Sequence, residues 1–295
     1  MARFDSGAYD PRLNTPRYKL AVDSLDTLVS LLRGQRLAVL TGAGCSTESG
    51  IPDYRGPGTR DRARNPIQHK AFISDPRARA RYWARSAVGW ARFSTVEPNP
   101  AHRALAEMER SNHLTGLVTQ NVDRLHHRAG SEHVVELHGA LAEVRCLVCE
   151  AREPRDTLQA RILELNPRFE LHALNRIELA PDGDTDLDSG GDFRVPPCRA
   201  CGGVLKPDVV FFGDNVPRPR VEAAFAITDA ADVLLVVGSS LTVFSGYRFV
   251  LRAAERGQPV AIVNLGETRG DPHARVRVDA RAGELMPELL AALRA

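Results

Sequence analysis

The chain has 295 residues, enough for one large α/β domain with an insertion or for two modest domains. Hydrophobic residues make up 43%, charged residues 26%, and the formal net charge is +2, so the composition gives no reason to expect nucleic acid or an anionic membrane as a partner. No window approaches the roughly 20 continuous apolar residues of a membrane span, and the first residues lack the apolar core of a secretory signal, so we expect a cytoplasmic protein.

The first half of the chain alternates short helices with apolar strands. Residues 1–22 contain Pro and Arg without a period and are expected to form an N-terminal arm. Ser24 is placed to cap a helix that Gly34 ends, and the apolar run at 36–40 then predicts a strand. A loop rich in Gly, Pro and Arg is expected over 51–66. Helices are expected over 76–90 and 100–110, and buried strands over 114–118 and 134–137.

The first strand runs into a glycine turn that is nearly a dinucleotide-binding motif. Gly42 and Gly44 fill the first two positions of G-x-G-x-x-G, but Thr47 occupies the third. A helix starting directly after the turn would offer its N-terminal amides to a pyrophosphate. A dehydrogenase of this type also needs an acidic residue at the end of a second strand about 20 residues later. Residues 60–64 belong to a loop and follow no strand, so the pattern disfavours hydride transfer.

Polar side chains follow the next two strands. Asn121, Asp123 and His138 lie just past predicted strand ends, where open α/β sheets place their ligand crevice. On spacing alone, His138 is as consistent with a structural residue as with a base that takes a proton from a hydroxyl near neutral pH. His126 and His127 fall inside a helical stretch and are expected at the surface.

Four of the five cysteines form two Cys-x-x-Cys pairs, which are typical of a closed, structural zinc site. The pairs are Cys146 with Cys149 and Cys198 with Cys201. They fit a reducing compartment with a metal site better than a disulfide framework. A nucleic-acid-binding ribbon is disfavoured because the acidic run at 182–188 would repel phosphates. The fifth, Cys45, lies where a helix N-terminus would lower its thiol pKa, but no partnering base is identifiable, so we expect no catalytic role.

The pattern changes between the two cysteine pairs and then resumes. Residues 142–205 are predicted to be an inserted zinc-binding module with a helix over 157–165. Strands are expected over 208–212, 233–237 and 260–263, and helices over 218–228, 245–256 and 284–290. The fold predicted is therefore α/β: a doubly wound, parallel, Rossmann-like sheet formed by residues 23–141 and 206–295, interrupted by the small module.

These motifs together resemble the sirtuin family, in the family's order, over about residues 25–290. The matching segments are Gly42–Gly44 with Ser46–Arg55, Thr119–Asp123, His138–Gly139, the two cysteine pairs, Pro207–Asp214, Gly238–Ser240 and Asn264–Gly266. The closest likeness is to the class II, mitochondrial sirtuin-4-like branch, because Arg81–Arg85, the Asn99–His102 turn and the long zinc-module insert also look like that branch.

The resemblance implies an NAD-dependent protein-lysine deacylase. In that reaction the nicotinamide–ribose bond is broken and the acyl oxygen of the substrate attacks the anomeric carbon, so NAD is consumed. Nicotinamide, O-acyl-ADP-ribose and free lysine are released. The resemblance makes His138 the general base on a ribose hydroxyl, and it places Asn121 and Asp123 at the border of the nicotinamide pocket. Acyl-lysine proteins or peptides are the implied partners, and one structural zinc the implied metal.

The remaining site residues are carried over from the same motifs. Cofactor contacts are implied for Gly42, Ala43, Gly44, Ser46, Thr47, Glu48, Asp53, Tyr54, Arg55, Arg62, Gln120, Asn121, Val122, Asp123, Gly238, Ser239, Ser240, Asn264, Leu265, Gly266 and Ala282. An extended peptide would pair with Val210, Phe211, Phe212 and Gly213 and with the segment after Ser240, which needs backbone pairing more than particular side chains.

Two questions stay open at this stage. Tyr82 and Arg85 resemble the pair with which desuccinylating sirtuins hold a carboxylate, which would favour acidic acyl groups such as glutaryl or methylglutaryl. The alternative is that both are surface or packing groups of an Arg-rich helix. The activity itself has a second candidate, protein mono-ADP-ribosyl transfer, which shares the cofactor site. A zinc-stabilised NAD-binding regulator without turnover is disfavoured by the intact Asn121, Asp123 and His138.

Overall fold

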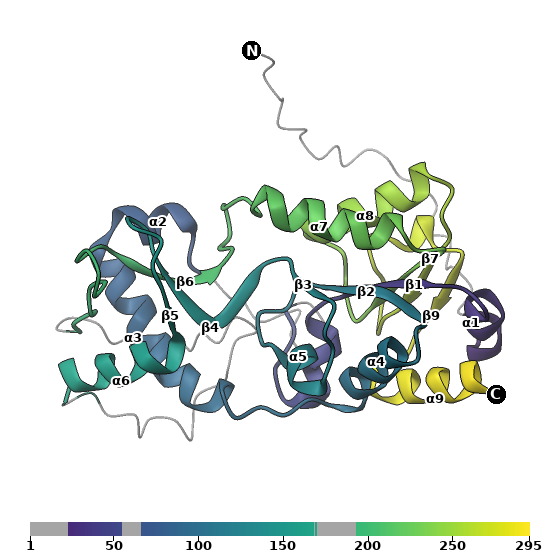
Figure 1. The fold of residues 1–295 in the computed structure, drawn as a ribbon, viewed down its shortest axis with the longest axis horizontal. Helices are drawn as coiled ribbons and strands as arrows, with labels where there is room; N and C mark the ends of the chain where they lie inside the picture. Colours follow the sequence, from purple (N-terminus) through teal and green to yellow (C-terminus); the bar gives the residue numbers. More distant parts are fainter. Residues whose placement is uncertain (1–22, 55–65, 168, 170–192) are drawn as a thin grey trace, which may run out of the picture.

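The computed structural model describes residues 23–54, 66–167, 169 and 193–295. The arm predicted at 1–22 lies outside these residues. Two sheets organise the described part of the chain (Figure 1). The larger one is parallel, with the strand order β3-β2-β1-β7-β8-β9. Its strands are β1 (Leu37–Thr41), β2 (Leu114–Thr119), β3 (Val134–Glu136), β7 (Val233–Val237), β8 (Val260–Val263) and β9 (Val276–Val278).

The strand order reverses between β1 and β7. The chain steps from β1 to β2 and β3 on one side, and then returns to place β7 on the other side of β1. The connections that leave β1 and β7 therefore run to opposite faces of the sheet at this topological switch point, which is where doubly wound sheets leave a crevice for a ligand. This arrangement confirms the predicted α/β class.

Alternate residues of the buried strands face opposite helical layers. In β1, Leu37 and Val39 share a core with residues of α1 (Leu25–Leu32), α4 (Pro100–Arg110) and α9 (Ala282–Arg294). Ala38 and Leu40 belong to the opposite core, with residues of α7 (Arg218–Asp229) and α8 (Phe244–Glu255). Figure 1 shows α7 and α8 above the sheet and α4 and α9 below it. A strand covered on both faces reads as a continuous apolar run, which is why β1, β7 and β8 are visible in the sequence.

The smaller sheet is antiparallel, with the order β5-β4-β6. It comprises β4 (Gly139–Cys146), β5 (Arg152–Pro154) and β6 (Leu205–Val209), and it packs with α2 (His69–Ser74), α3 (Pro76–Phe93) and α6 (Arg155–Leu165) around Phe72, Trp83, Val144, Leu158 and Ile162. The strand predicted at 208–212 as part of the parallel sheet was wrong, because residues 205–209 pair with β4 instead. β4 begins before residue 142 and β6 ends after residue 205, so both strands cross the limits predicted for the zinc module. Those limits stay a prediction.

Side chains that accept backbone hydrogen bonds define where helices begin. Ser24 Oγ accepts from Thr27 N at 3.2 Å, as expected from its position. Asp75 Oδ1 accepts from Arg77 N at 2.8 Å and precedes a proline at the first position of α3. Such caps satisfy amides that have no partner within the helix. Among the described helices, none is long and apolar enough to cross a membrane.

One glycine fixes the junction between the two sheets. Gly139 directly follows His138 and has φ +80°, and a Cβ there would lie 1.9 Å from the carbonyl oxygen of Asp208. We expect Gly139→Ala to lower the free energy of unfolding by about 3 kcal/mol or more, because strain at positive φ adds to a clash with backbone. Urea unfolding at constant pH measures the loss.

The matched control is Gly257→Ala, at the end of α8. Gly257 has φ +66°, but nothing lies within 4 Å of its Cβ position. This variant should lose only about 1 kcal/mol, the cost of the backbone conformation alone. Equal losses in the two variants would contradict a steric limit at Gly139.

Candidate active site

A cavity of about 1180 Å³ opens at the carboxyl end of the parallel sheet. Its walls come from the segments that follow β1, β2, β7 and β8, together with His138 and residues 209–216. The predicted site residues that line it are Gly42, Ala43, Gly44, Ser46, Asp53, Tyr54, Gln120, Asn121, Val122, Asp123, His138, Val210, Phe211, Phe212, Gly213, Gly238, Ser239, Ser240, Asn264, Leu265 and Gly266. The fold thus gathers most of the predicted set into one cavity.

The glycine turn forms part of this cavity by close contact with the end of β7. A helix was expected directly after the turn, and the chain continues from Gly42 as a 3-10 helix, Ala43–Ser49. Gly44 N donates to the carbonyl oxygen of Gly238 at 2.8 Å. A Cβ at Gly44 would lie 2.9 Å from that same oxygen, and one at Gly238 would lie 2.2 Å from Cys45 N. Two glycines are therefore required where the strand ends meet.

A chain of hydrogen bonds ties the turn to the segment after β2. Asn121 Nδ2 donates to the carbonyl oxygen of Gly42 and to Ser46 Oγ, both at 3.0 Å. Ser46 Oγ in turn donates to Asp123 Oδ2 at 2.7 Å. The other carboxylate oxygen of Asp123 accepts from Leu125 N at 2.9 Å. Burial raises the pKa of the Asp123 carboxyl, while these hydrogen bonds act in the opposite direction. The predicted polar residues thus hold one another in place.

His138 is held as a neutral imidazole with a defined tautomer. Its Nδ1 lies 2.8 Å from the carbonyl oxygen of Gln120, and because a carbonyl can only accept, Nδ1 carries the proton. Its Nε2 therefore has the lone pair and accepts from Ser245 Oγ at 2.8 Å. Burial lowers the pKa of His138 to about 4, so the ring is neutral at pH 7. A neutral histidine with the lone pair on Nε2 at the cavity wall has the form that a general base requires, once Ser245 releases it.

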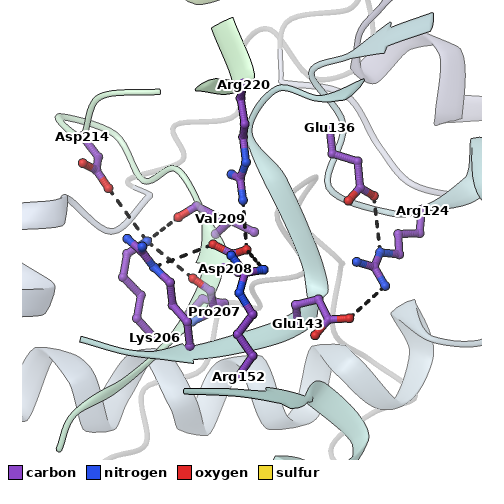
Figure 2. A network of polar contacts seen from close by, with 11 residues as sticks. Arg124, Glu136, Glu143, Arg152, Lys206, Pro207, Asp208, Val209, Asp214 and Arg220 are labelled. Atoms are coloured by element: carbon purple, nitrogen blue, oxygen red, sulfur yellow. Dashed lines mark hydrogen bonds and ion pairs between the residues drawn. The ribbon is translucent and has the colours of Figure 1, made fainter. Parts of the chain in front are cut away.

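Arg124 braces the two strands that flank His138 (Figure 2). Its Nε lies 3.4 Å from Glu136 Oε1 in β3, and its Nη1 lies 3.1 Å from Glu143 Oε1 in β4. Since His138 lies between these strands in sequence, the pair of contacts fixes the backbone on both sides of the histidine.

Asp208 joins the small sheet to a helix of the large domain (Figure 2). Its Oδ2 accepts from Arg152 Nη1 in β5 and from Arg220 Nη2 in α7, both at 2.9 Å. The following backbone is tied to the histidine, since Val210 N donates to the carbonyl oxygen of His138 at 2.8 Å. Bonds from Arg to a buried carboxylate are charge-assisted and therefore strong. This network aligns the segment that follows β6 with His138.

Lys206 holds the segment that follows β6 through contacts with its two ends. Its side chain is 1% exposed, its Nζ donates to the carbonyl oxygen of Val209, and it lies 3.9 Å from Asp214 Oδ2. The ammonium also lies 4.3 Å from the ring centroid of Phe211. Burial lowers the pKa of Lys206 to about 8, with Asp214 opposing the shift. The lysine thus links Val209 to Asp214 (Figure 2), at the two ends of a segment that lines the cavity.

Some predicted cofactor residues support the turn without lining the cavity. Thr47 Oγ1 donates to the carbonyl oxygen of Gly44 at 3.0 Å. Glu48 Oε2 accepts from Gly283 N at 2.5 Å, at the start of α9, next to the buried Ala282. A carboxylate at a helix N-terminus is stabilised by the helix dipole. Arg55 and Arg62 lie outside the described residues, so their predicted contacts stay predictions.

Tyr82 and Arg85 also do not line the cavity. Tyr82 is 4% exposed and lies in the core of the small domain, with its ring centroid 5.5 Å from Phe72 and 5.2 Å from Phe211. Phe211 itself lines the cavity, so Tyr82 lies directly behind its wall. Arg85 is half-buried, one turn further along α3.

Sequence reasoning missed two residues near the site. His126 was expected at the surface, but it is 1% exposed, and its Nε2 lies 2.9 Å from Thr41 Oγ1; its short helix, α5 (Leu125–Ala129), packs inward. Ser245 was not predicted, although it donates to His138. No local signal identifies it, because it lies 107 residues further along the chain and belongs to a different element.

The four paired cysteines come together as predicted. Cys146 Sγ lies 3.5 Å from Cys201 Sγ, and Cys149 Sγ lies 3.7 Å from Cys198 Sγ. All four sulfurs lie within 4.8 Å of one another. Zinc–sulfur bonds of about 2.3 Å in a tetrahedron place neighbouring sulfurs about 3.8 Å apart, so this set fits a structural zinc.

A doubly wound sheet with a large cavity at its switch point defines the class: a Rossmann-like α/β protein built to bind a nucleotide. Comparison with known families is more specific. The Sir2 family model matches residues 42–245, and the chain belongs to this family. It is 51% identical over 261 residues to "NAD-dependent protein deacetylase 1" of Mycobacterium avium, covering 88% of this chain and 92% of that protein. It is 50% identical over 264 residues to "NAD-dependent protein deacylase Sirt4" of Drosophila melanogaster, covering 88% and 84%.

Solved structures agree with the family. A structure described as a Sir2 homolog–NAD complex superposes with a TM-score of 0.70 at 32% identity, covering 91% of this chain and 93% of that one. A structure described as Sir2–p53 peptide–NAD+ gives a TM-score of 0.70 at 30% identity, covering 91% and 98%.

We expect the purified protein to hold one zinc per chain at the four cysteines, and Cys149→Ser to hold nearly none. Loss of the metal should lower the melting temperature, since a structural zinc contributes directly to folding. Inductively coupled plasma mass spectrometry gives the zinc count, and calorimetry the melting temperature. Cys45→Val is the control, because Cys45 lies outside this cluster and should keep its zinc. A Cys149→Ser protein with a full complement of zinc would refute the assignment.

Proposed function

We propose that this chain is an NAD-dependent protein-lysine deacylase. The observation that carries the proposal is the neutral His138, which holds a lone pair on Nε2 in the same cavity as the glycine turn. Relatives about half identical over most of the chain carry deacetylase and deacylase names. The cavity, at about 1180 Å³, exceeds the roughly 300–1,000 Å³ of pockets for drug-sized ligands, which leaves room for a dinucleotide with an acyl-lysine.

The residues of the cavity fit NAD. The close-packed turn at Gly42–Gly44 allows backbone to approach a pyrophosphate, and Asn264 and the residues after it border the cavity beyond β8. Bound there, NAD would supply a ribose whose bond to nicotinamide is labile to attack by the acyl oxygen. His138 Nε2 would then take a proton from a ribose hydroxyl, and Ser245 would give up its hydrogen bond to make way. Asn121 and Asp123 would keep the nicotinamide end in place through Ser46.

An acyl-lysine peptide would enter between residues 210–213 and the segment after Ser240. Both segments border the cavity. Strand addition between them would leave recognition to main-chain hydrogen bonds, and the acyl-lysine side chain would point toward His138. The network of Asp208 and Lys206 keeps one of these two segments in register.

We further propose that the chain belongs to the class II, sirtuin-4-like branch and that it prefers acidic acyl chains. The similarity to the Drosophila deacylase supports the branch. Tyr82 packs on the cavity-lining Phe211, and Arg85 follows three residues later on the same helix. A guanidinium suits a carboxylate through its fork of donors. A small movement of Phe211 would open the cavity toward Tyr82 and the face of α3 behind it.

The reaction is tested by mass spectrometry of NAD with acetyl-, glutaryl- and succinyl-lysine peptides. We expect nicotinamide, free lysine and O-acyl-ADP-ribose in equal amounts, and a loss of about 10²- to 10⁴-fold in rate for His138→Ala. The neutral form of His138 is the active one, so kcat/KM should stay level as pH falls from 7 and drop only as pH approaches the pKa of about 4. ADP-ribosylated protein without deacylation would favour mono-ADP-ribosyl transfer, and reduced cofactor would refute the proposal.

The acyl preference is tested by Arg85→Met. We expect the ratio of glutaryl to acetyl kcat/KM to fall at least about tenfold, since a charge-assisted hydrogen bond to the acyl carboxylate is lost. Arg81→Met is the matched control: Arg81 lies on the same helix but is exposed, so its ratio should equal that of the unaltered protein. If the glutaryl to acetyl ratio is the same in both variants, Arg85 does not contact the acyl carboxylate and is a packing residue.

A further inference from the structure

Three potential metal ligands lie together beneath the glycine turn, away from the four-cysteine cluster. The sulfur of Cys45 and one ring nitrogen each from His102 and His126 lie within 4.8 Å of one another. They come from three elements: the turn after β1, α4 and α5. Their exposed fractions are 0%, 0% and 1%, so the cluster is dry. The two imidazole ring centroids are 4.7 Å apart.

The hydrogen bonding of this cluster is incomplete. His126 Nδ1 is buried and has no hydrogen-bond partner among the described residues, while its Nε2 lies 2.9 Å from Thr41 Oγ1. His102 uses Nδ1 to complete the cap of α4 with Asn99, and its Nε2 has only a 3.4 Å contact to Ser46 Oγ. Buried polar atoms are satisfied in most proteins, so an orphaned ring nitrogen beside a free thiol needs an explanation.

We propose that Cys45, His102 and His126 form a binding site for a cuprous ion, Cu⁺. Thiolate and imidazole donors suit soft transition-metal ions. The thiol proton leaves to solvent as the sulfur–copper bond forms, with no change of oxidation state, and the thiolate neutralises the single charge of Cu⁺. A neutral complex suits a dry site, whereas a closed Zn²⁺ site needs four ligands and this cluster offers three.

The geometry requires a modest closure of the cluster. Metal bonds of about 2.0–2.3 Å to nitrogen and sulfur place neighbouring ligands about 3.5 Å apart. Ligand atoms now up to 4.8 Å apart must therefore approach by about 1 Å. His102 is fixed by the cap of α4, so the approach falls to Cys45 on the turn and to His126 on the short helix α5.

Movement of Cys45 would disturb the large cavity. Asn99 Nδ2 donates to the carbonyl oxygen of Cys45 at 2.8 Å, and the next residue, Ser46, lines the cavity and bonds both Asn121 and Asp123. Bound copper should therefore weaken NAD binding, by about tenfold for a typical coupling, and NAD should weaken copper binding by the same factor. This effect rests on the proposed function, but the metal site itself does not.

The test loads the full, zinc-containing chain with Cu⁺ from a chelator-buffered solution without oxygen. Native mass spectrometry should show one copper per chain with the zinc retained, and Cys45→Val should bind none. X-ray absorption at the copper edge, which does not detect zinc, should report one sulfur and two nitrogen ligands in the unaltered protein. His126→Gln should bind copper more weakly while keeping its zinc.

Three results would overturn the site: no copper uptake, all-sulfur coordination with loss of zinc, or equal uptake by Cys45→Val. The X-ray absorption spectrum of the unaltered protein identifies the copper ligands even if a variant does not fold. Unchanged NAD affinity in a copper-loaded protein with the expected ligands would refute the coupling while supporting the site. Absence of deacylase activity in the zinc-containing, copper-free protein would instead refute the proposed function alone.

Discussion

The contact between Gly44 and Gly238 is the constraint on which the site depends. It presses the turn after β1 against the end of β7 at the switch point of the sheet, with a hydrogen bond of 2.8 Å and no room for a Cβ on either residue. The turn then continues as a 3-10 helix, which places Ser46 where it bonds Asn121 and Asp123. A side chain at either glycine would separate the strand ends and break the hydrogen bonds between Ser46, Asn121 and Asp123.

The second constraint is the junction between the two sheets. His138 leads directly into β4, and β6 returns antiparallel to it, so the histidine and the segment after β6 are positioned by one pair of strands. Arg124 and Asp208 tie this pair to β3 and α7. The zinc cluster closes the far end of the same strands, since Cys146 ends β4 and Cys201 lies shortly before β6. A zinc held by these cysteines would thus support the position of the proposed base from the opposite end of β4.

Much of this could be predicted from the sequence. β1, β7 and β8 are continuous apolar runs because both their faces are buried, and the paired cysteines carry their own spacing signal. β6 was misplaced because the prediction followed the apolar run at 209–212, whereas the paired strand is the more polar segment before it, and only pairing with β4 decides. The burial of His126 and the contact of Ser245 with His138 depend on packing between distant elements, which no local pattern encodes.

The central claim is that NAD is consumed at this cavity as the acceptor of the acyl oxygen. The most direct test uses a peptide whose acyl-lysine carbonyl carries ¹⁸O, with mass spectrometry of the product after fragmentation. If the acyl oxygen attacks the anomeric carbon, the label should appear on the ribose of O-acyl-ADP-ribose. A ribose without label, with ¹⁸O confined to the acyl group or lost to water, would contradict the account.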